Sequence, residues 1–128
     1  MDAPPAIASV TGLALMPDAP DGVTCWAGQL RDDPDLRVMV LLEGQADALD
    51  TGFVDRICAD RETHLAAASQ AAGLGGEVRR WDPAVTFRGG RSWEVRFTEA
   101  PGPTELGLLV VFDGERIVEV DDLSDWDY

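Results

Sequence analysis

The stretch from Asp50 to Gly73 is the only long segment of this chain with helical periodicity, and it constrains the fold more than any other. Asp50 is a suitable N-cap, and Gly73 followed by Leu74 suits a Schellman ending. The pattern predicts one long helix over about residues 50–72. Its apolar side chains recur at steps of three, four or seven and therefore share one face: Val54, Ile57, Cys58, Leu65, Ala68 and Ala72.

Short apolar runs separated by turn residues lie on both sides of this helix. The runs expected to form strands are 7–16, 22–30, 36–42, 77–81, 84–88, 92–98, 106–112 and 115–120. Both faces of 36–42 and 106–112 are apolar, which is typical of strands inside a sheet. We therefore expect an α+β fold, an antiparallel sheet of about six or seven strands with the helix packed across one face. Residues 1–128 would form a single domain, with a flexible tail at 1–6 and an acidic tail at 121–128.

Two hairpins have registers that can be predicted from their apolar faces. In the first, Phe87 must share a face with Trp93, so the loop around the intervening glycines needs an odd number of residues, three at the simplest. In the second, a two-residue loop of Asp113-Gly114 would set Val110 opposite Ile117.

The charge of the chain is strongly negative. Twenty-four acidic residues oppose ten basic ones, a formal net charge of -14. Such a protein repels the phosphates of nucleic acids and anionic membranes, so the expected partner is a basic protein. All ten basic residues are arginine, and the chain has no lysine and no asparagine, which also fits a GC-rich genome or an acidic halophile proteome. Five of the arginines lie within residues 77–98, where we expect them to pair with acids on neighbouring strands.

Acidic residues gather at two places, one at 32–35 and one at the C-terminus. Neither follows the spacing of an EF-hand calcium loop. In the C-terminal group aromatic side chains alternate with carboxylates, as they do at protein interfaces; alternatively, this is an acidic tail whose tryptophan folds back onto the sheet. The candidate partner-binding residues are Asp32, Asp33, Asp35, Asp121, Asp122, Asp125, Trp126, Asp127 and Tyr128.

His64 is the only histidine, and Asp60 lies one helical turn before it on the same face. A metal site would need a third ligand from elsewhere, and a nucleophilic site would need Cys25 or a serine beside the imidazole. Cys25 and Cys58 lie far apart with no CxxC pattern, and we expect free, partly buried thiols in a reducing cytosol. The sequence predicts a structural His64 and no catalytic residue, metal or cofactor.

The N-terminus lacks the basic residues of a signal peptide, and no apolar stretch approaches the ~20 residues that span a membrane, so we expect a cytoplasmic protein. In size, acidity and architecture the chain resembles the immunity proteins that bacteria pair with secreted toxins, a likeness of class that rests on no residue motif. The resemblance implies a non-enzymatic inhibitor of a basic toxin. Two alternatives stay open: an acidic housekeeping or halophile-type domain, and a small-ligand binder or enzyme that uses His64 with Cys25 or Cys58.

Overall fold

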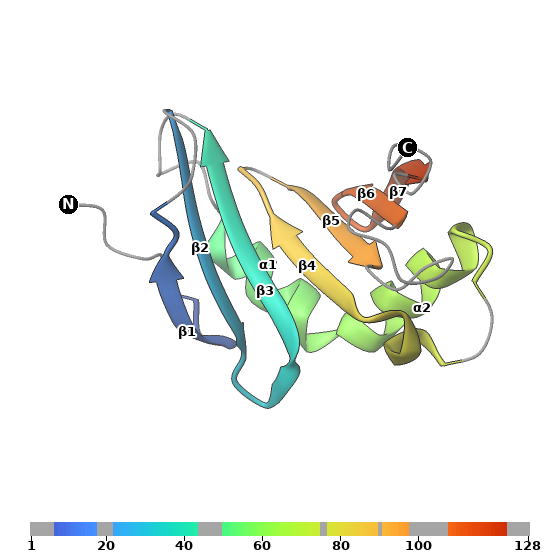
Figure 1. Ribbon diagram of the computed structural model, residues 1–128, viewed down its shortest axis with the longest axis horizontal. Coiled ribbons are helices and arrows are strands. Elements are labelled where there is room, and N and C mark those ends of the chain that lie inside the picture. Colours follow the sequence, from blue (N-terminus) through green and yellow to red (C-terminus); the bar gives the residue numbers. More distant parts are fainter. Residues whose placement is uncertain are drawn as a thin grey trace.

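Seven strands form one sheet in the computed structural model, in the order in which they follow one another along the chain (Figure 1). The structure describes residues 7–17, 22–43, 50–74, 77–89, 91–97 and 108–122. The expected α+β class is confirmed. The strands are β1 (Val10–Leu15), β2 (Val23–Leu30), β3 (Asp33–Glu43), β4 (Pro83–Phe87), β5 (Ser92–Phe97), β6 (Leu108–Asp113) and β7 (Arg116–Asp122).

The sheet is antiparallel except at its third neighbour pair, where β3 and β4 run parallel. The expectation of a purely antiparallel sheet was therefore wrong at this point. The helical segment leaves the end of β3 and crosses the face of the sheet before β4 begins, and such a crossover returns the chain in the direction of the first strand. β3 lies inside the sheet, paired with both β2 and β4, as its two apolar faces predicted.

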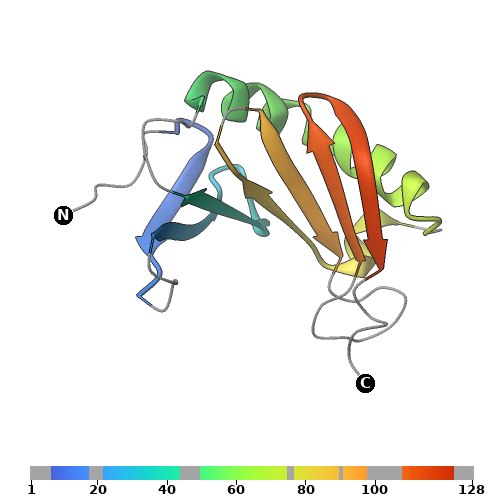
Figure 2. The ribbon, with the colours of Figure 1, turned by 90° about the horizontal axis from the view of Figure 1, so that it is seen from above.

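The segment expected to be one long helix is two helices, α1 (Thr51–Ala59) and α2 (Arg61–Ala71). Asp60 separates them with φ −111° and ψ 28°, and its N–H donates to the carbonyl of Ile57, which tightens the last turn of α1. The apolar positions on the two sides of the break stay on one face, so periodicity alone does not reveal it. Both helices cover the same face of the sheet, one after the other (Figures 1 and 2).

The predicted ends of this helical segment are confirmed. The Asp50 carboxylate accepts a hydrogen bond from the Phe53 N–H at 3.0 Å, which makes it the N-cap of α1. At the other end Gly73 has φ 75°, its N–H donates to Gln70, and the Leu74 N–H donates to Ser69. These two bonds are the pair that defines a Schellman motif.

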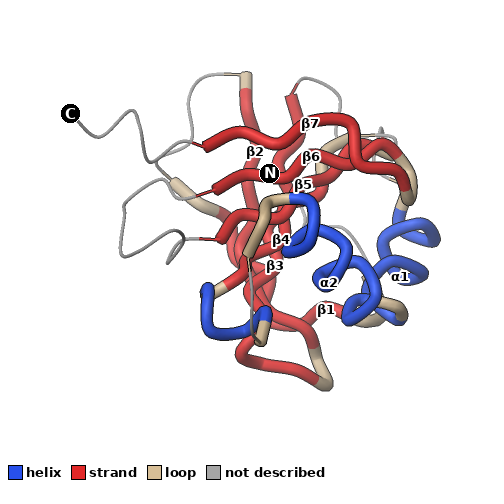
Figure 3. The backbone as a smooth tube through the Cα atoms, turned by 90° about the vertical axis from the view of Figure 1, so that its right-hand side faces the viewer, coloured by secondary structure: helices blue, strands red, loops and turns tan. Residues whose placement is uncertain are grey.

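The core lies between the helices and the sheet, which form two layers (Figure 3). Each helix contributes the side chains that the periodicity predicted, with Val54, Ile57, Leu65 and Ala68 almost wholly buried. Burial of such side chains contributes roughly 1.5–3 kcal/mol each. The strands contribute Trp26, Val38, Val40, Val85, Phe87, Trp93, Val95, Phe97, Val110 and Phe112. No helix among the described residues covers the opposite face.

The hairpin between β4 and β5 has the predicted register. Phe87 lies opposite Trp93 and Val85 opposite Val95, so the loop is odd. The Arg88 N–H donates to the Ser92 carbonyl at 2.9 Å and closes a three-residue loop. All four apolar side chains therefore face the helices.

The hairpin between β6 and β7 departs from its prediction. The turn is Gly114-Glu115, one residue later than expected, and Phe112 pairs with Ile117. A bulge between Val111 and Phe112 then sets Val110 opposite Val120 instead of Ile117. Gly114 supplies the positive φ of 65° that the turn requires. The bulge adds one extra residue to the strand pairing, which shifts the register. β6 lies inside the sheet, between β5 and β7, as its two apolar faces predicted, although one of these faces is only half-buried.

Two further expectations were wrong. Residues 78–81 form a short 3₁₀ helix, η2 (Val78–Trp81), instead of a strand. Asp121 and Asp122 belong to β7, so the acidic tail expected from residue 121 does not begin there. The expected flexible tail at 1–6 lies outside the described residues. Among those that are described, no helix is long and apolar enough to cross a membrane.

Candidate functional site

An acidic hollow opens where the start of β3, the first turn of α2 and the start of β4 meet. It has a volume of about 420 Å³ and is lined by Asp33, Asp35, Glu62, Asp82 and Pro83. Two of these carboxylates, Asp33 and Asp35, were predicted from the sequence. Glu62 and Asp82 were not, because they lie far away in the chain and reach this place only through the crossover from β3 to β4.

Two arginines neutralise part of the hollow. The Arg37 guanidinium lies 2.8 Å from the Asp82 carboxylate, and both side chains are about half exposed. Arg61 donates to Asp33 at 3.0 Å, and to the carbonyl of Cys58 at 3.0 Å. Asp82 has a φ of 51°, a left-handed conformation that Asp tolerates better than most residues.

Asp32 lies on the other side of Arg61, in a neighbouring surface hollow of about 390 Å³ that also contains Ser9 and Asp55. Its carboxylate is 3.5 Å from the Arg61 guanidinium, which therefore links the two hollows. Ser9 donates to Asp55 through both its N–H and its hydroxyl, an interaction that fixes the chain before β1 against α1. The two hollows are lined by six described carboxylates, of which Arg37 and Arg61 pair with three: Asp32, Asp33, Asp35, Asp55, Glu62 and Asp82.

The second predicted acidic group is separate from the hollow. Register places Asp121 of β7 in one row across the sheet with Leu109, Arg96 and Ala84, the last of which pairs with Arg37. Four strand spacings, about 19 Å, therefore separate Asp121 from the Arg37 position, at the same end of the sheet. The structure does not bring the two predicted groups together into one patch.

Asp121 instead lies beside Glu119 on β7. The pKa of Glu119 is raised because the Asp121 side chain hydrogen-bonds to it and repels its negative charge. Asp122 ends the strand. The other predicted contacts, Asp125, Trp126, Asp127 and Tyr128, lie outside the described residues.

His64 of α2 is buried in the core between the helices and the sheet. Only 6% of the residue is exposed. Its ring packs edge-on against Trp93, at 5.4 Å between centroids, and against Phe112, at 6.1 Å. Those two rings stack on each other at 4.1 Å, so the imidazole sits against a rigid aromatic wall.

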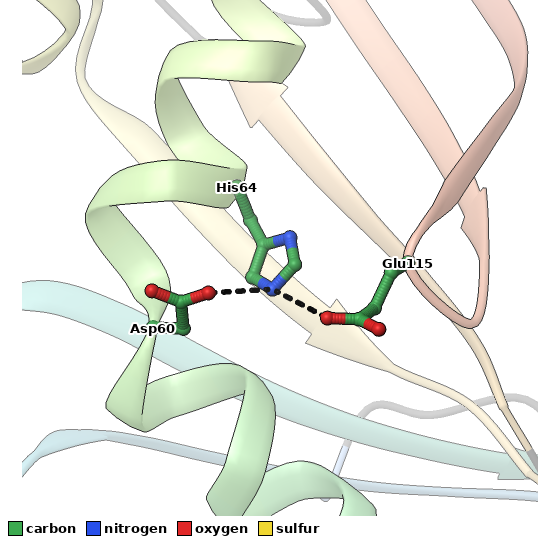
Figure 4. A group of neighbouring side chains, drawn as sticks. All are labelled: Asp60, His64 and Glu115. Atoms are coloured by element: carbon green, nitrogen blue, oxygen red, sulfur yellow. Dashed lines mark ion pairs between the residues drawn. The ribbon is translucent and has the colours of Figure 1, made fainter.

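Two carboxylates, Asp60 at the start of α2 and Glu115 in the β6–β7 turn, approach the buried imidazole (Figure 4). The Nε2 atom of His64 lies 4.0 Å from Asp60 Oδ2 and 4.0 Å from Glu115 Oε1. Both distances exceed a hydrogen bond, and Nε2 has no hydrogen-bond partner within the described part of the chain. Asp60 was identified from the sequence, whereas Glu115 was not, because its approach depends on the β6–β7 turn.

The thiols lie in unreactive environments. Cys25 neighbours Trp26 in β2 and so projects to the opposite face of the sheet from the Trp26 side and from His64. Burial raises the pKa of the Cys25 thiol, and it raises that of Cys58 to about 11. Cys58 and His64 do line one internal cavity, but its volume of about 10 Å³ is no more than a single water requires.

No family model, no curated protein and no solved structure matches the chain.

Proposed function

We propose that this chain is a non-enzymatic binding protein of the immunity or inhibitor type, whose acidic hollow engages a basic partner such as a bacterial toxin domain. The observation that carries the proposal is the hollow itself, in which three separate parts of the chain contribute carboxylates to one concave surface. Asp33 and Asp35 lie together because they are close in the sequence. Glu62 and Asp82 are distant in the sequence, and the fold brings them to the same surface.

The electrostatics of the hollow suit recognition of arginine or lysine side chains. Among the described residues, Arg37 pairs with Asp82 and Arg61 with Asp33 beside the hollow. Asp35 and Glu62 are the exposed carboxylates of the lining. A net negative concave surface accelerates the approach of a positively charged partner and favours it over neutral or acidic proteins.

The test is the association rate of a charge-reversal variant, Asp35→Lys with Glu62→Lys. The partner is the basic protein encoded by a toxin-like reading frame next to the gene, or the basic protein that the wild-type chain retains from its native lysate. At low salt we expect the variant to associate about tenfold more slowly than wild type, with a weaker dependence on salt.

The matched control reverses two exposed charges on β6 and β7, away from the hollow, Asp113→Lys with Glu119→Lys. Both variants change the net charge equally, so a general effect of net charge slows them alike. A larger loss for the hollow variant locates the contact there. Equal rates for the two variants would contradict the proposed site, and partner binding by wild type that ignores salt would contradict the steering mechanism.

The aromatic anchors expected from the sequence remain a prediction. If Trp126 contacts the partner, Trp126→Ala should raise the dissociation rate and cost about 2 kcal/mol or more, with little effect on association. His64 contributes nothing to the hollow, so His64→Gln should leave partner binding unchanged. A loss of binding by a folded His64→Gln protein would contradict this assignment of the site.

The alternative of an enzyme or small-ligand binder built on His64 with a cysteine finds less support in the geometry. Cys25 lies on the opposite face of the sheet, and the raised pKa of Cys58 keeps its thiol protonated at neutral pH. The cavity that His64 shares with Cys58 has no room for a substrate.

A further inference from the structure

Two features of the surroundings of His64 act on its Nε2 atom: burial without a hydrogen bond, and the approach of two carboxylates. The atom is buried, and a buried nitrogen without a hydrogen bond costs free energy. It faces two carboxylates, Asp60 and Glu115, whose oxygens lie too far away to bond it. The three facing atoms lie within 4.8 Å of one another, so two like charges converge on one unpaired nitrogen. A cation between them would satisfy all three groups.

The surrounding contacts hold these groups in place. The Thr63 hydroxyl donates to Asp60 Oδ1 at 3.0 Å, which leaves Oδ2 turned to the imidazole. Near Glu115, Trp93 Nε1 donates to the Gly114 carbonyl at 2.7 Å, and the Gly114 N–H donates to the Arg91 carbonyl at 2.9 Å. Trp93 therefore packs against His64 and also hydrogen-bonds to the turn that carries Glu115. Such supporting contacts are typical of metal sites.

We infer that His64, Asp60 and Glu115 form a binding site for a divalent first-row transition cation, with Zn²⁺ as the representative ion. One imidazole nitrogen and two carboxylate oxygens are common Zn²⁺ ligands, whereas Mg²⁺ and Ca²⁺ prefer oxygen alone. Three protein ligands leave a fourth position for water or for a group from a partner. The break between α1 and α2 places Asp60 at the start of α2, close to His64 and Glu115.

The distances require a small contraction. Two ligands at about 2 Å from a tetrahedral Zn²⁺ lie about 3.4 Å apart, so each 4.0 Å distance from Nε2 must close by about 0.6 Å. The two carboxylate oxygens, within 4.8 Å of each other, must close by up to about 1.4 Å. The buried imidazole can stay in place, because the side chains of Asp60 and Glu115 are 60% and 64% exposed and a small rotation of each brings its carboxylate closer. A bound ion would connect the start of α2 to the β6–β7 turn.

The test is calorimetric titration of the tag-free full chain with Zn²⁺, in wild type and in two matched variants of one hairpin. Glu115→Gln removes a ligand, and Glu119→Gln removes an equal charge from β7 without touching the site. Both residues are on the surface, so both variants should fold. We expect one Zn²⁺ per chain for wild type and Glu119→Gln with equal affinity, and at least tenfold weaker binding for Glu115→Gln.

The second measurement is the nitrogen NMR spectrum of the imidazole. Its signals can be assigned without ambiguity because the chain has a single histidine. We expect saturating Zn²⁺ to shift the Nε2 signal in the Glu119→Gln protein and in wild type alike. Two results would overturn the inference: equal Zn²⁺ affinity in all three proteins, which indicates diffuse binding to the acidic surface, or an Nε2 signal that Zn²⁺ does not move. Absence of measurable Zn²⁺ binding to wild type would overturn it as well.

Discussion

Arg88 and Glu94 form an ion pair on the face of the sheet that no described helix covers. Arg88 donates to the same Glu94 oxygen through Nε at 2.9 Å and Nη2 at 2.6 Å. Only 7% of the Glu94 side chain is exposed, against 39% for Arg88. This pair confirms in part the expectation that the arginines of residues 77–98 pair with acids on neighbouring strands.

Removing one partner of this pair should cost more than removing both. Arg88→Met leaves a buried carboxylate that has lost this partner, and we expect a loss of about 3 kcal/mol in the free energy of unfolding, since water reaches Arg88 and softens the penalty. The double variant Arg88→Met with Glu94→Leu should recover most of it. Urea denaturation of the single and double variants measures the difference. A double variant that is less stable than Arg88→Met would contradict the argument.

Gly28 is a residue where the sheet tolerates no side chain. A Cβ atom there would lie 2.6 Å from the Thr11 carbonyl oxygen, inside the irregular pairing of β1 with β2. We expect Gly28→Ala to destabilise the protein by about 1–3 kcal/mol, as overpacking does. The control is Gly52→Ala in α1, where a Cβ meets nothing closer than 3.6 Å and helix propensity should add about 0.5–1 kcal/mol. Denaturation midpoints of the two variants should move in opposite directions, and a shift in the same direction would contradict the prediction.

The two thiols should resist alkylation in the native protein. With a pKa of about 11, roughly one Cys58 molecule in a thousand is a thiolate at pH 8, compared with about one in four for a free cysteine. Iodoacetamide should therefore label Cys58 at least a hundredfold more slowly in buffer than in urea. The Cys58→Ser variant separates its labelling from that of Cys25. Fast labelling of native Cys58 would show that its environment is more open than the structure describes.

At the level of secondary structure, the ends of the helical segment could be predicted from sequence and its interior could not. Asp50 and Gly73 act through hydrogen bonds with residues a few positions away, so local sequence determines them. At the break, Arg61 donates to Asp33 at the start of β3, a contact between residues far apart in the sequence that local periodicity does not predict. The same distinction applies to the hairpins: the odd loop follows from apolar faces, whereas a bulge moved the register of β7.

The candidate sites follow the same rule. Asp33 and Asp35 were found because they are close in sequence, and His64 with Asp60 because they are one helical turn apart. Glu62, Asp82 and Glu115 come from other elements, and only the β3–β4 crossover and the β6–β7 turn bring them to their sites. Single-sequence periodicity carries no information about such contacts.

The close packing of α2 against the sheet rests on a small residue. Ala68 is wholly buried, whereas Ala66 on the same helix is exposed. Ala68→Leu should force the helix away from the sheet and cost about 1–3 kcal/mol, while Ala66→Leu should change stability by less than about 0.5 kcal/mol. Thermal unfolding of both variants, which have identical composition, checks this. Equal melting temperatures would show that the helix does not need a small residue at this contact.

At the scale of the whole molecule, the charge could reflect either a partner or an environment. The first alternative proposes that the acidity of the hollow is selected for binding. The second, a halophile-type domain, makes the same -14 a property of the surface as a whole. The two differ in what salt does, because screening weakens attraction to a partner and also relieves self-repulsion within the fold.

Thermal melts from about 0.05 M to about 2 M KCl separate these alternatives, because the Debye length falls from more than about 10 Å to less than about 3 Å over that range. For a binding protein we expect the melting temperature to rise by only a few degrees, most of it below about 0.3 M, since the arginines of the hollow already pair with its acids. Over the same range the association rate with a basic partner should fall steeply, while dissociation changes little. For a halophile-type domain the melting temperature should instead rise over the whole salt range. The Asp35→Lys, Glu62→Lys variant has less charge repulsion, so its melting temperature should exceed that of wild type at low salt and equal it at high salt. A large continuous rise without any retained basic partner would contradict the proposed function and leave the cation site at His64 to be judged on its own titration.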